Sequence, residues 1–394
     1  MSLLDRLVAP GPKRLLALDG GGIRGMLSLG FLAEIETILR EREDRADLVL
    51  ADYFDLIGGT STGAIIAAGL ALGMSVEELR KLYAEAGGKA FGKKLALLGR
   101  LRASYDAGPL EAILKERLGD VTLGDERLRT GLCIIAKRAD TNSTWPMHNH
   151  PRGRYFDANR RIPLWRAVRA STAAPTYFVP ELMQIPDRVG ALHDVAFVDG
   201  GVSMCVNPAL QLFMLATMQS YAFNWPTGPD DLLLVSVGTG TWQTTAVPRE
   251  VASGKLWNWA QMVPGMLMDD SSWQAQLLLQ WWSASPTPWL IDREIGDLRG
   301  DVLGGRPLLS YLRYDVRLEP DCLTRLGEPK LAKQAAALRQ MDNADLRDAL
   351  ERIGRQAATK TLVDEHGREI QYAVLPSHFG AGFDRSAAEA SLVA

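Results

Sequence analysis

The sequence has little cysteine, no excess of basic residues and no long hydrophobic run. Its 394 residues include three cysteines, Cys133, Cys205 and Cys322, without CxxC spacing or nearby histidines. This pattern predicts buried thiols in a reducing compartment and argues against a disulfide framework or a zinc site. The formal net charge of −3 argues against nucleic acid as a main ligand, because binding a phosphate backbone requires positive charge.

The sequence also lacks a segment that could cross a bilayer as a helix. The longest apolar candidate, residues 64–74, falls well short of the roughly 20 residues that a span requires. The amino terminus mixes acidic and basic residues and reaches a Pro-Gly break before any sustained apolar run, so it does not resemble a signal peptide. We therefore expect a cytoplasmic protein, which can still act at a membrane surface.

What the sequence does contain is an alternation of apolar strand-like runs and helical patterns from residue 14 to about residue 240. This alternation predicts an α/β fold with a central, mostly parallel sheet covered by helices. The predicted strands are residues 14–19, 53–59, 131–137, 195–200, 231–238 and 308–319. Predicted helices cover residues 26–43 and 75–87, the second starting with Ser75 and Glu78 as a capping box.

The composition of the sequence changes after about residue 245. Residues 257–289 are rich in tryptophan and methionine, and a further strand, a charged helix over 344–366 and a loose tail follow. No Gly/Ser-rich or highly charged linker separates the two parts. We therefore expect a catalytic core over 12–245 and, over 246–394, an elaboration of the same domain.

The stretch "RLLALDGGGIRGML" places three glycines between a predicted strand and a predicted helix. Gly20, Gly22 and Gly25 match the GxGxxG pattern of dinucleotide-binding folds, which expects an acidic residue at the tip of the second strand. The acidic residues in that range, Asp44 and Asp47, lie in a charged linker instead. The same turn, with its unpaired N–H groups and helix dipole, can stabilise negative charge that develops on a carbonyl oxygen during acyl transfer.

A candidate nucleophile follows the second predicted strand. Ser61 lies at the centre of Gly-Thr-Ser-Thr-Gly, a GxSxG match between an apolar strand and a helix rich in small residues. The turn at such an elbow is tight, so the residues two positions before and after the serine must be small. Gly59 and Gly63 meet this requirement.

A serine hydroxyl needs a base to take its proton. Only His366 and His378 come late enough for the Ser, Asp, His order of α/β-hydrolases, and they lie in a hydrophilic turn and a loose tail. Asp199 ends an apolar strand and precedes Gly200 and Gly201. We expect its carboxylate at the same sheet edge as the ends of the other strands.

Taken together, "DGGGIRG", "GTSTG" and "DGG", in that order, resemble the patatin-like phospholipase family over residues 12–242. The stretches "ASTAAPTYF" (170–178) and "SVGTGT" (236–241) support the resemblance. It implies a fold similar to the catalytic domain of cytosolic phospholipase A2 and a lipid acyl hydrolase that uses a Ser-Asp dyad without a cofactor. The residues it implies are Ser61 as nucleophile, Asp199 as general base, Gly20, Gly21 and Gly22 as the oxyanion hole, and Arg24 as the basic residue of the glycine motif.

Other interpretations stay open at this point. His148 and His150 lie two apart in a Pro-flanked loop, which indicates surface polarity more than metal binding. Residues 87–104 mix basic and apolar side chains, as either a membrane-surface segment or an ordinary amphipathic helix would. The segment 257–289 is either a membrane-facing cap, core or an oligomer contact.

The rival functions are an NAD-dependent enzyme and a catalytically idle storage or scaffold protein on the patatin fold. The resemblance extends to bacterial patatin-like enzymes of this size that look like defence effectors switched on by cyclic nucleotides. The predicted partners are accordingly a phospholipid membrane surface, a cyclic nucleotide activator and a second copy of the chain, with no metal and no nucleic acid.

Overall fold

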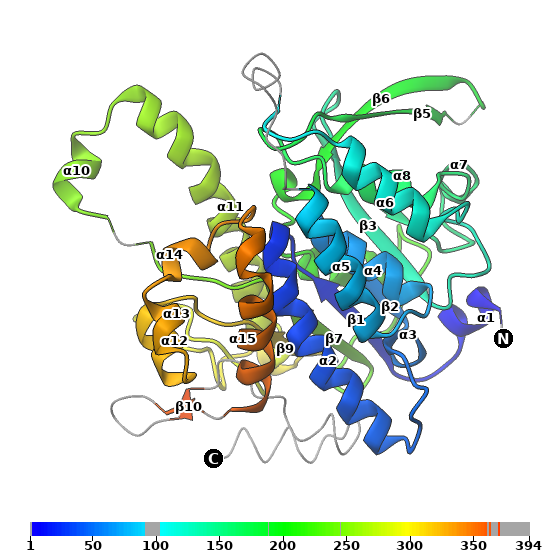
Figure 1. Ribbon diagram of the computed structural model, residues 1–394. Coiled ribbons are helices and arrows are strands. Elements are labelled where there is room, and N and C mark those ends of the chain that lie inside the picture. The colour runs from blue at the N-terminus through cyan, green and yellow to red at the C-terminus, as the bar shows by residue number, and fades with distance from the viewer. Residues whose placement is uncertain are drawn as a thin grey trace.

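The computed structural model describes residues 2–90, 103–187, 189–244, 246–360, 362–363 and 369–370. A central sheet with helices on both faces organises these residues (Figure 1). Alternate residues of one central strand face two separate clusters of buried side chains: Leu16 and Leu18 contribute to one cluster, and Leu15 and Ala17 to the other. Because both faces of the sheet are covered, its strands read as continuous apolar runs in the sequence.

The strands are β1 (Lys13–Leu18), β2 (Leu56–Thr60), β3 (Gly131–Arg138), β4 (Ser143–His148), β5 (Glu181–Pro186), β6 (Leu192–Asp199), β7 (Leu232–Val237), β8 (Ser283–Ala284) and β9 (Leu309–Tyr314). A separate short pair consists of β10 (Leu362–Val363) and β11 (Glu369–Ile370). Hydrogen-bonded neighbours follow the order β5-β6-β3-β2-β1-β7-β9-β8, and β4 also pairs with β3. The pairs along β3-β2-β1-β7-β9-β8 are parallel, whereas β4, β5 and β6 run antiparallel to their partners.

The longer helices are α2 (Gly25–Arg42), α4 (Thr62–Ala71), α5 (Val76–Ala90), α6 (Gly108–Leu118), α8 (Leu164–Ser171), α9 (Ala209–Thr217), α11 (Leu256–Trp281) and α15 (Arg347–Thr359). The shorter ones are α1 (Leu3–Val8), α3 (Leu50–Tyr53), α7 (Phe156–Asn159), α10 (Pro248–Ala252), α12 (Pro320–Arg325), α13 (Pro329–Ala332) and α14 (Ala335–Leu338). Short 3-10 helices include η1 (Gly22–Arg24), η3 (Gly200–Ser203) and η5 (Ala344–Leu346). None of the described helices is both long and apolar enough to cross a bilayer.

The predicted mostly parallel sheet and its covering helices are confirmed, and the six predicted strands correspond to β1, β2, β3, β6, β7 and β9. The second strand starts later than predicted because residues 50–53 form the helical turn α3. The capping box before α5 is present: Glu78 N–H donates to Ser75 Oγ at 3.3 Å, and Ser75 N–H donates to the Glu78 carboxylate at 2.8 Å. The three cysteines are free and buried, as predicted.

The carboxy-terminal part differs more from expectation. Strand β9 and the short β8 join the same sheet as β1, and the helix predicted over 344–366 starts as η5 and ends as α15 at Thr359. Most of the Trp/Met-rich segment, up to Trp281, forms the single long helix α11, and β8 follows. In the amino-terminal core, the Pro-flanked loop expected around His148 begins instead as the end of strand β4, which can hold Pro146 because, among the described strands, it pairs only with β3.

Strand β3 positions the ends of two other strands. Its residues 133–135 pair with β2 and also with β4, so these two strands lie on opposite sides of β3. Strand β4 continues along residues 136–138, and β6 pairs with those same residues. Strand β6 must therefore lie on the side of β2 and meet it end to end, with Thr60 opposite Ile135 and Asp199 opposite Ala136.

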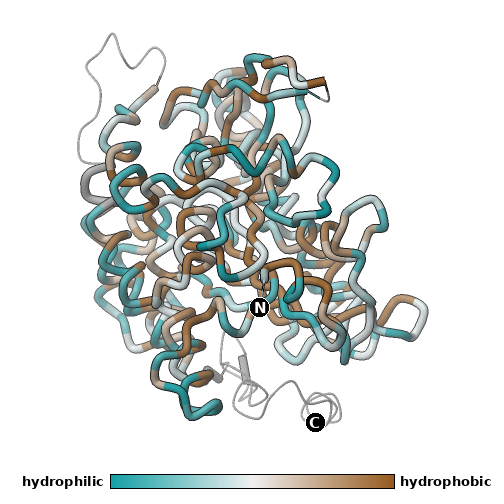
Figure 2. Tube along the Cα trace, turned by 90° about the vertical axis from the view of Figure 1, so that its right-hand side faces the viewer, coloured by the Kyte–Doolittle hydropathy of each residue, from teal (hydrophilic) through white to brown (hydrophobic). Residues whose placement is uncertain are grey.

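Helix α15 packs directly on α2, and the two lie side by side in Figure 1. Hydrophobic stretches run through the interior of the chain trace in Figure 2, between more polar outer segments. The approach of the two helices depends on Gly30 and Gly354: a β-carbon at Gly354 would overlap the backbone carbonyl of Leu27. Backbone atoms cannot move aside as a flexible side chain can, so any larger residue separates the helices.

We predict that Gly354→Ala lowers the free energy of unfolding by about 1–3 kcal/mol, the usual cost of overpacking a core. The measurement is urea unfolding followed by far-UV circular dichroism. Gly265→Ala, inside α11, is the matched control, because a β-carbon there meets no atom within 4 Å. That change should be neutral or stabilise by up to about 1 kcal/mol, since alanine favours helices. Equal effects of the two substitutions would refute the close α2–α15 contact.

Candidate active site

Ser61 occupies a sharp turn between β2 and α4. Its backbone has φ 55° and ψ −122°, a conformation that non-glycine residues rarely adopt. Such strained positions cost of the order of 1–3 kcal/mol and persist only where surrounding contacts enforce them. One of these contacts is a 2.8 Å hydrogen bond from the Ser61 N–H to the hydroxyl of Ser171, at the end of α8. The Ser171 hydroxyl in turn donates to the carbonyl of Ile135 in β3.

Two glycines permit this turn. A β-carbon at Gly59 would overlap the backbone carbonyl of Gly63, and a β-carbon at Gly63 would overlap the carbonyl of Leu18 in β1. The start of α4 is thus pressed against the ends of β1 and β2. Because α4 begins directly after Ser61, the positive end of its dipole also lies at the serine.

Asp199 lies at the predicted edge of the sheet, but the strand that carries it runs in the opposite direction to β1, β2 and β3. We expected Asp199 at the sheet edge where parallel strands end, but β6 runs antiparallel to β3 and approaches from beyond that edge. Strand β6 pairs only with residues 136–138 of β3, whereas β2 pairs with residues 131–135. The last residue of β6 therefore lies directly beyond the end of β2. A β-carbon at the following residue, Gly200, would overlap the Ile135 carbonyl and lie 3.1 Å from Thr60 Cγ2. The antiparallel strand therefore delivers its terminal aspartate to the predicted edge.

The carboxyl group of Asp199 is buried. Burial raises its pKa to about 6, against the opposite effects of the Ser61 hydroxyl and the N–H of Gly201. Gly201 N–H donates to Asp199 Oδ1 at 2.8 Å, and this bond orients the carboxylate. Asp199 is thereby the N-cap residue of the 3-10 helix η3. At neutral pH this group is mostly ionised, yet its pKa is close enough to 7 for it to accept and return a proton.

The glycine turn lies beside the serine. A β-carbon at Gly20 would be 3.2 Å from Ser61 Cβ, so a larger residue there would press against the nucleophile. The N–H of Gly20 donates to the carbonyl of Val206 at 2.9 Å. Within the described part of the chain, the N–H groups of Gly21 and Gly22 donate to no other protein group. These two N–H groups are therefore available to a ligand.

Side chains from three separate segments hold the carbonyls of this turn. Thr239 Oγ1 donates to Gly20 O at 2.9 Å, Arg24 Nε donates to Gly21 O at 3.3 Å, and Tyr83 Oη donates to Gly22 O. In a trans peptide the C=O and the following N–H point in opposite directions. Fixing the carbonyls of Gly20 and Gly21 consequently fixes the directions of the N–H groups of Gly21 and Gly22.

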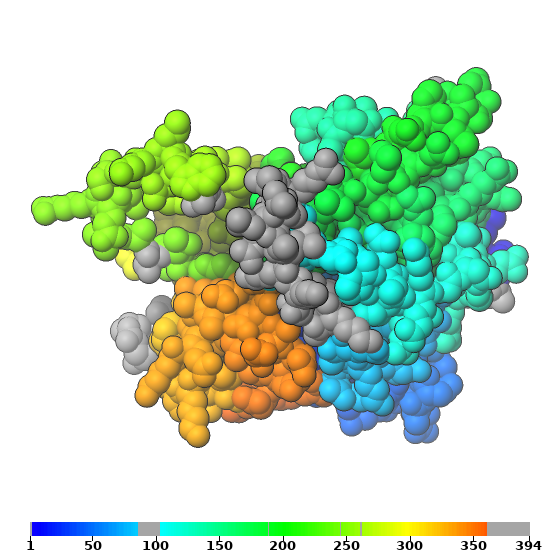
Figure 3. All heavy atoms as spheres, turned by 45° about the horizontal axis from the view of Figure 1, so that its top comes forward, coloured from blue at the N-terminus to red at the C-terminus, as the bar shows by residue number. Residues whose placement is uncertain are grey.

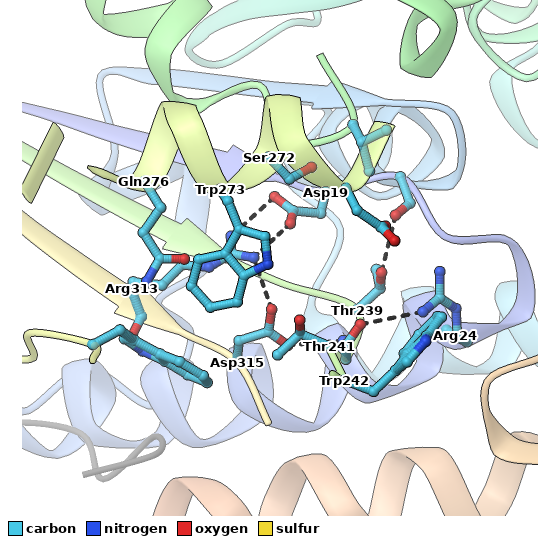
Figure 4. Close-up of a pocket in the computed structure, with 15 residues that line it drawn as sticks. Asp19, Arg24, Thr239, Thr241, Trp242, Ser272, Trp273, Gln276, Arg313 and Asp315 are labelled. Atoms are coloured by element: carbon cyan, nitrogen blue, oxygen red, sulfur yellow. Dashed lines mark hydrogen bonds and ion pairs between the residues drawn. The ribbon is translucent and has the colours of Figure 1, made fainter. Parts of the chain in front are cut away.

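A buried ionic cluster supports the base of the turn. Arg313 contacts both carboxylate oxygens of Asp19, at 3.1 and 2.7 Å, and Asp315 at 2.7 Å (Figure 4). Burial raises the pKa of Asp19 to about 6 despite the neighbouring guanidinium of Arg313. Arg24, whose guanidinium lies 5.0 Å from the centre of the Trp242 ring, shares the pocket lined by these residues. Neither Ser61 nor Asp199 lines this pocket, which lies against the glycine turn through Gly20 and Arg24.

Several residues of this arrangement were not predicted. Ser171 and Thr239 lie within "ASTAAPTYF" and "SVGTGT", which support the family resemblance but indicate no role for either residue. Tyr83 and Arg313 carry no local signal, because their contacts with the glycine turn and with Asp19 join residues far apart in the sequence.

The histidines that the structure describes, His148, His150 and His193, do not contribute to the arrangement. His148 and His150 were expected at the surface, but they are buried, and burial lowers the pKa of each to about 4. His193 is exposed and contacts Asp187 at 3.0 Å. In the described ranges, no group of three or more histidine, cysteine or acidic side chains could hold a metal ion.

Some predictions fall elsewhere. His366, His378 and most of residues 87–104 lie outside the described residues.

The dinucleotide interpretation requires an acidic residue at the tip of β2. Asp44 and Asp47 are exposed beyond the far end of α2, whose 18 residues separate them from the glycine turn by roughly 27 Å.

Comparison with known proteins places these features in a family context. Residues 16–213 match the family model "Patatin-like phospholipase". The chain is 31% identical over 260 residues to a cGAMP-activated phospholipase of Vibrio cholerae, covering 62% of this chain and 70% of that protein. It is 30% identical over 231 residues to a cGAMP-activated phospholipase of Escherichia coli, of which the match spans only 62%, and covers 57% of this chain. Patatin-17 of Solanum cardiophyllum is 28% identical over 279 residues, covering 67% of this chain and 70% of patatin-17.

The raised pKa of Asp199 generates a prediction on stability. The folded state holds the Asp199 proton more tightly than the unfolded chain, so stability falls as pH rises from about 4 through about 6 and remains lower above it. A shift of about two pKa units corresponds to about 3 kcal/mol. Asp199→Asn removes this cost. Its free energy of unfolding relative to wild type should therefore be higher at about pH 8 than at about pH 4, by up to about 3 kcal/mol.

Urea unfolding of both proteins at the two pH values provides the measurement. Comparing the difference between pH values cancels any constant effect of the amide on packing. A wild-type-to-variant difference that is the same at both pH values would contradict the raised pKa.

Proposed function

The chain belongs to the patatin-like phospholipase family, whose members are lipid acyl hydrolases, and we propose that it cleaves fatty-acyl esters of membrane phospholipids with Ser61 and Asp199. The observation that carries the proposal is the juxtaposition of a serine in a strained turn with a buried carboxylate of pKa about 6, beside two glycine N–H groups that donate to none of the described residues. A nucleophile, a base and an anion-binding turn are the parts that serine-dependent acyl transfer requires.

The proposed reaction has two halves. Asp199 accepts the Ser61 proton while Ser61 Oγ attacks the ester carbonyl, and the protonated Asp199 then gives that proton to the departing alcohol. This leaves the acyl group esterified to Ser61. In the second half Asp199 removes a proton from water, which attacks the acyl-enzyme, and the proton returns to Ser61 Oγ as the fatty acid is released.

The glycine turn would hold the negative oxygen of each tetrahedral intermediate. Gly20, Gly21 and Gly22 were all expected to donate, but the Gly20 N–H is already bonded to Val206. We therefore assign the oxyanion contacts to the N–H groups of Gly21 and Gly22. Arg24 and Thr239 act as positioning residues, because they hold the carbonyls that set the direction of those N–H groups. Loss of one oxyanion donor typically costs about 3 kcal/mol of transition-state stabilisation.

We predict that Ser61→Ala and Asp199→Asn each lower fatty-acid release from mixed phospholipid vesicles by roughly 10³-fold or more, since each removes an indispensable part of the dyad. A soluble short-chain ester serves as a second substrate that does not require membrane contact. For wild type, kcat/KM on this ester should fall about tenfold per pH unit below about pH 6, where Asp199 becomes protonated.

Fluorophosphonate labelling separates this proposal from a catalytically idle protein on the same fold. The reagent should modify wild type at Ser61 and leave Ser61→Ala unlabelled. Ester hydrolysis that survives Ser61→Ala would refute the assignment of the nucleophile, and absence of both labelling and hydrolysis, with and without cyclic nucleotides, would favour the idle storage or scaffold protein.

We further propose that a cyclic nucleotide controls the activity. Two relatives are named cGAMP-activated phospholipases, and unrestrained hydrolysis would damage the host's own membranes, so an inactive resting state would protect the cell. This supports a regulated, membrane-degrading effector.

We predict that one member of a panel of cyclic mono- and dinucleotides, cGAMP included, increases fatty-acid release by wild type at least about tenfold, as expected for a coupling free energy within the usual range. Ser61→Ala with the same nucleotide is the control and should stay inactive. Full activity without any nucleotide, and no change upon adding any, would exclude this form of regulation.

A further inference from the structure

The first half of helix α11 is an unusual surface feature. Residues 255–267 are exposed wherever their side chains are described, whereas Ser271, Ala275 and Leu279 in the second half are buried. The exposed half projects away from the sheet together with α10 (Figure 1). Its exposed fractions are large for apolar side chains: 88% for Leu256 and 72% for Trp257. We call residues 256–268 the α11 arm.

The α11 arm is apolar and uncharged. Its sequence, "LWNWAQMVPGMLM", contains no acidic or basic residue. The exposed large apolar side chains, apart from Trp257, follow helical spacing along one side: Leu256, Trp259, Met262, Val263, Met266 and Leu267. Soluble proteins rarely leave a contiguous apolar stripe in water, and such stripes usually mark a surface that binds something.

The α11 arm packs against the short segment that follows Asp199. A β-carbon at Gly201 would lie 3.6 Å from Cε of Met268, so the end of the arm packs against the residue whose N–H orients the Asp199 carboxylate. Two further apolar side chains on this short segment are exposed, Val202 at 47% and Met204 at 64%. Exposed apolar surface thus extends from the arm to the immediate neighbourhood of Asp199.

A second apolar projection lies on the same face of the molecule. The β5–β6 hairpin, which ends in Asp199, exposes Leu182, Leu192 and, near its turn, Val189. The projecting end of the chain trace at the upper right of Figure 2 is hydrophobic. In Figure 3 the residues of α10 and the α11 arm (yellow-green, left) and the hairpin (green, right) form two separate projections toward the same side.

We propose that the α11 arm is the membrane-docking element of this enzyme and that it takes a phospholipid bilayer. The inference rests on the proposed lipid acyl hydrolase function and identifies the surface through which that function reaches its substrate. A bilayer fits better than a protein partner because the arm offers no charged group for pairing over thirteen residues, and because the two apolar projections are separate rather than one flat face. Tryptophan and methionine side chains of the arm are suited to the boundary between headgroups and acyl chains.

The test uses the otherwise intact chain with Ser61→Ala, so that vesicles are bound without being consumed. The probe is sedimentation with vesicles of equal parts phosphatidylcholine and phosphatidylglycerol. Adding Leu256→Asp and Leu267→Asp, both on the apolar side of the arm, should weaken binding at least about tenfold, because transferring one large apolar side chain into the bilayer contributes more than this factor. Both side chains are more than half exposed, so the fold should tolerate the changes.

The control Val8→Asp is matched to Leu267→Asp alone, because each places one negative charge on an exposed apolar residue, 62% exposed for Leu267 in the arm and 48% exposed for the control in the distant helix α1. It should bind vesicles as the parent does. Vesicles whose acyl chains carry bromine should quench tryptophan fluorescence in the parent, and the quenching should fall when Trp257 and Trp259 are replaced by phenylalanine.

Three results would overturn the proposal: no vesicle binding by the parent, equal binding by the double aspartate variant and the parent, or a change from dimer to monomer in that variant with vesicle binding retained. The last would make the α11 arm an interface between copies of the chain. Hydrolysis of the soluble short-chain ester by the chain with native Ser61 is measured in parallel, in the presence of the cyclic mono- and dinucleotides. Its presence without vesicle binding would refute only the docking surface, whereas its absence with intact binding would refute only the proposed chemistry.

Discussion

Strand β3 imposes the constraint on which the candidate active site depends. One side of this strand pairs first with β2 and then, beyond the last residue of β2, with β6. The two strands meet end to end, so the residue after β2, Ser61, and the last residue of β6, Asp199, are brought together by backbone hydrogen bonds. A buried sheet holds such a register firmly, because a shift of one residue would turn every side chain to the opposite face. The pairing of serine and aspartate is thus fixed by the backbone before any side-chain contact is considered.

The local geometry at this junction is costly, and the surrounding structure offsets the cost. Ser61 has a rare backbone conformation, Asp199 is a buried carboxyl group, and Asp19 and Asp315 are a second pair of buried acidic residues. Each would destabilise an otherwise ordinary core. The compensation comes from well-ordered contacts: Ser171 holds the turn of Ser61, and Arg313 bridges the two buried aspartates. Strain of this kind concentrates at sites where geometry matters more than local stability.

The sequence predicts the local parts of this arrangement well. Apolar runs locate the main strands, and GxSxG between a strand and a small-residue helix locates the elbow, since both signals lie within a few consecutive residues. Asp199 lies at the edge where the sequence predicts it, but the antiparallel direction of β6 was not predicted, because strand direction depends on pairing with β3, which is remote in sequence. Arg313 lies 294 residues from Asp19 along the sequence, and no local pattern predicts their contact. Strand β4, which contains Pro146, was not predicted, because a strand tolerates proline only where the proline nitrogen faces no neighbouring strand, and the sequence alone does not show which strands are neighbours.

Helix α11 links the surface of the molecule to both parts of the candidate catalytic apparatus. Its Met268 packs against Gly201, which orients Asp199, while Trp273 and Gln276, farther along the same helix, line the pocket shared with Gly20 and Arg24. Met268, Trp273 and Gln276 all lie after Pro264, which interrupts the hydrogen-bond ladder of α11, so one uninterrupted part of the helix makes both contacts. A ligand or a surface that moves α11 would therefore act on the orientation of the Asp199 carboxylate and on the glycine turn together. Such coupling would require no separate regulatory domain, because the helix proposed to contact the membrane is the one that packs against Gly201 and lines the pocket beside the glycine turn.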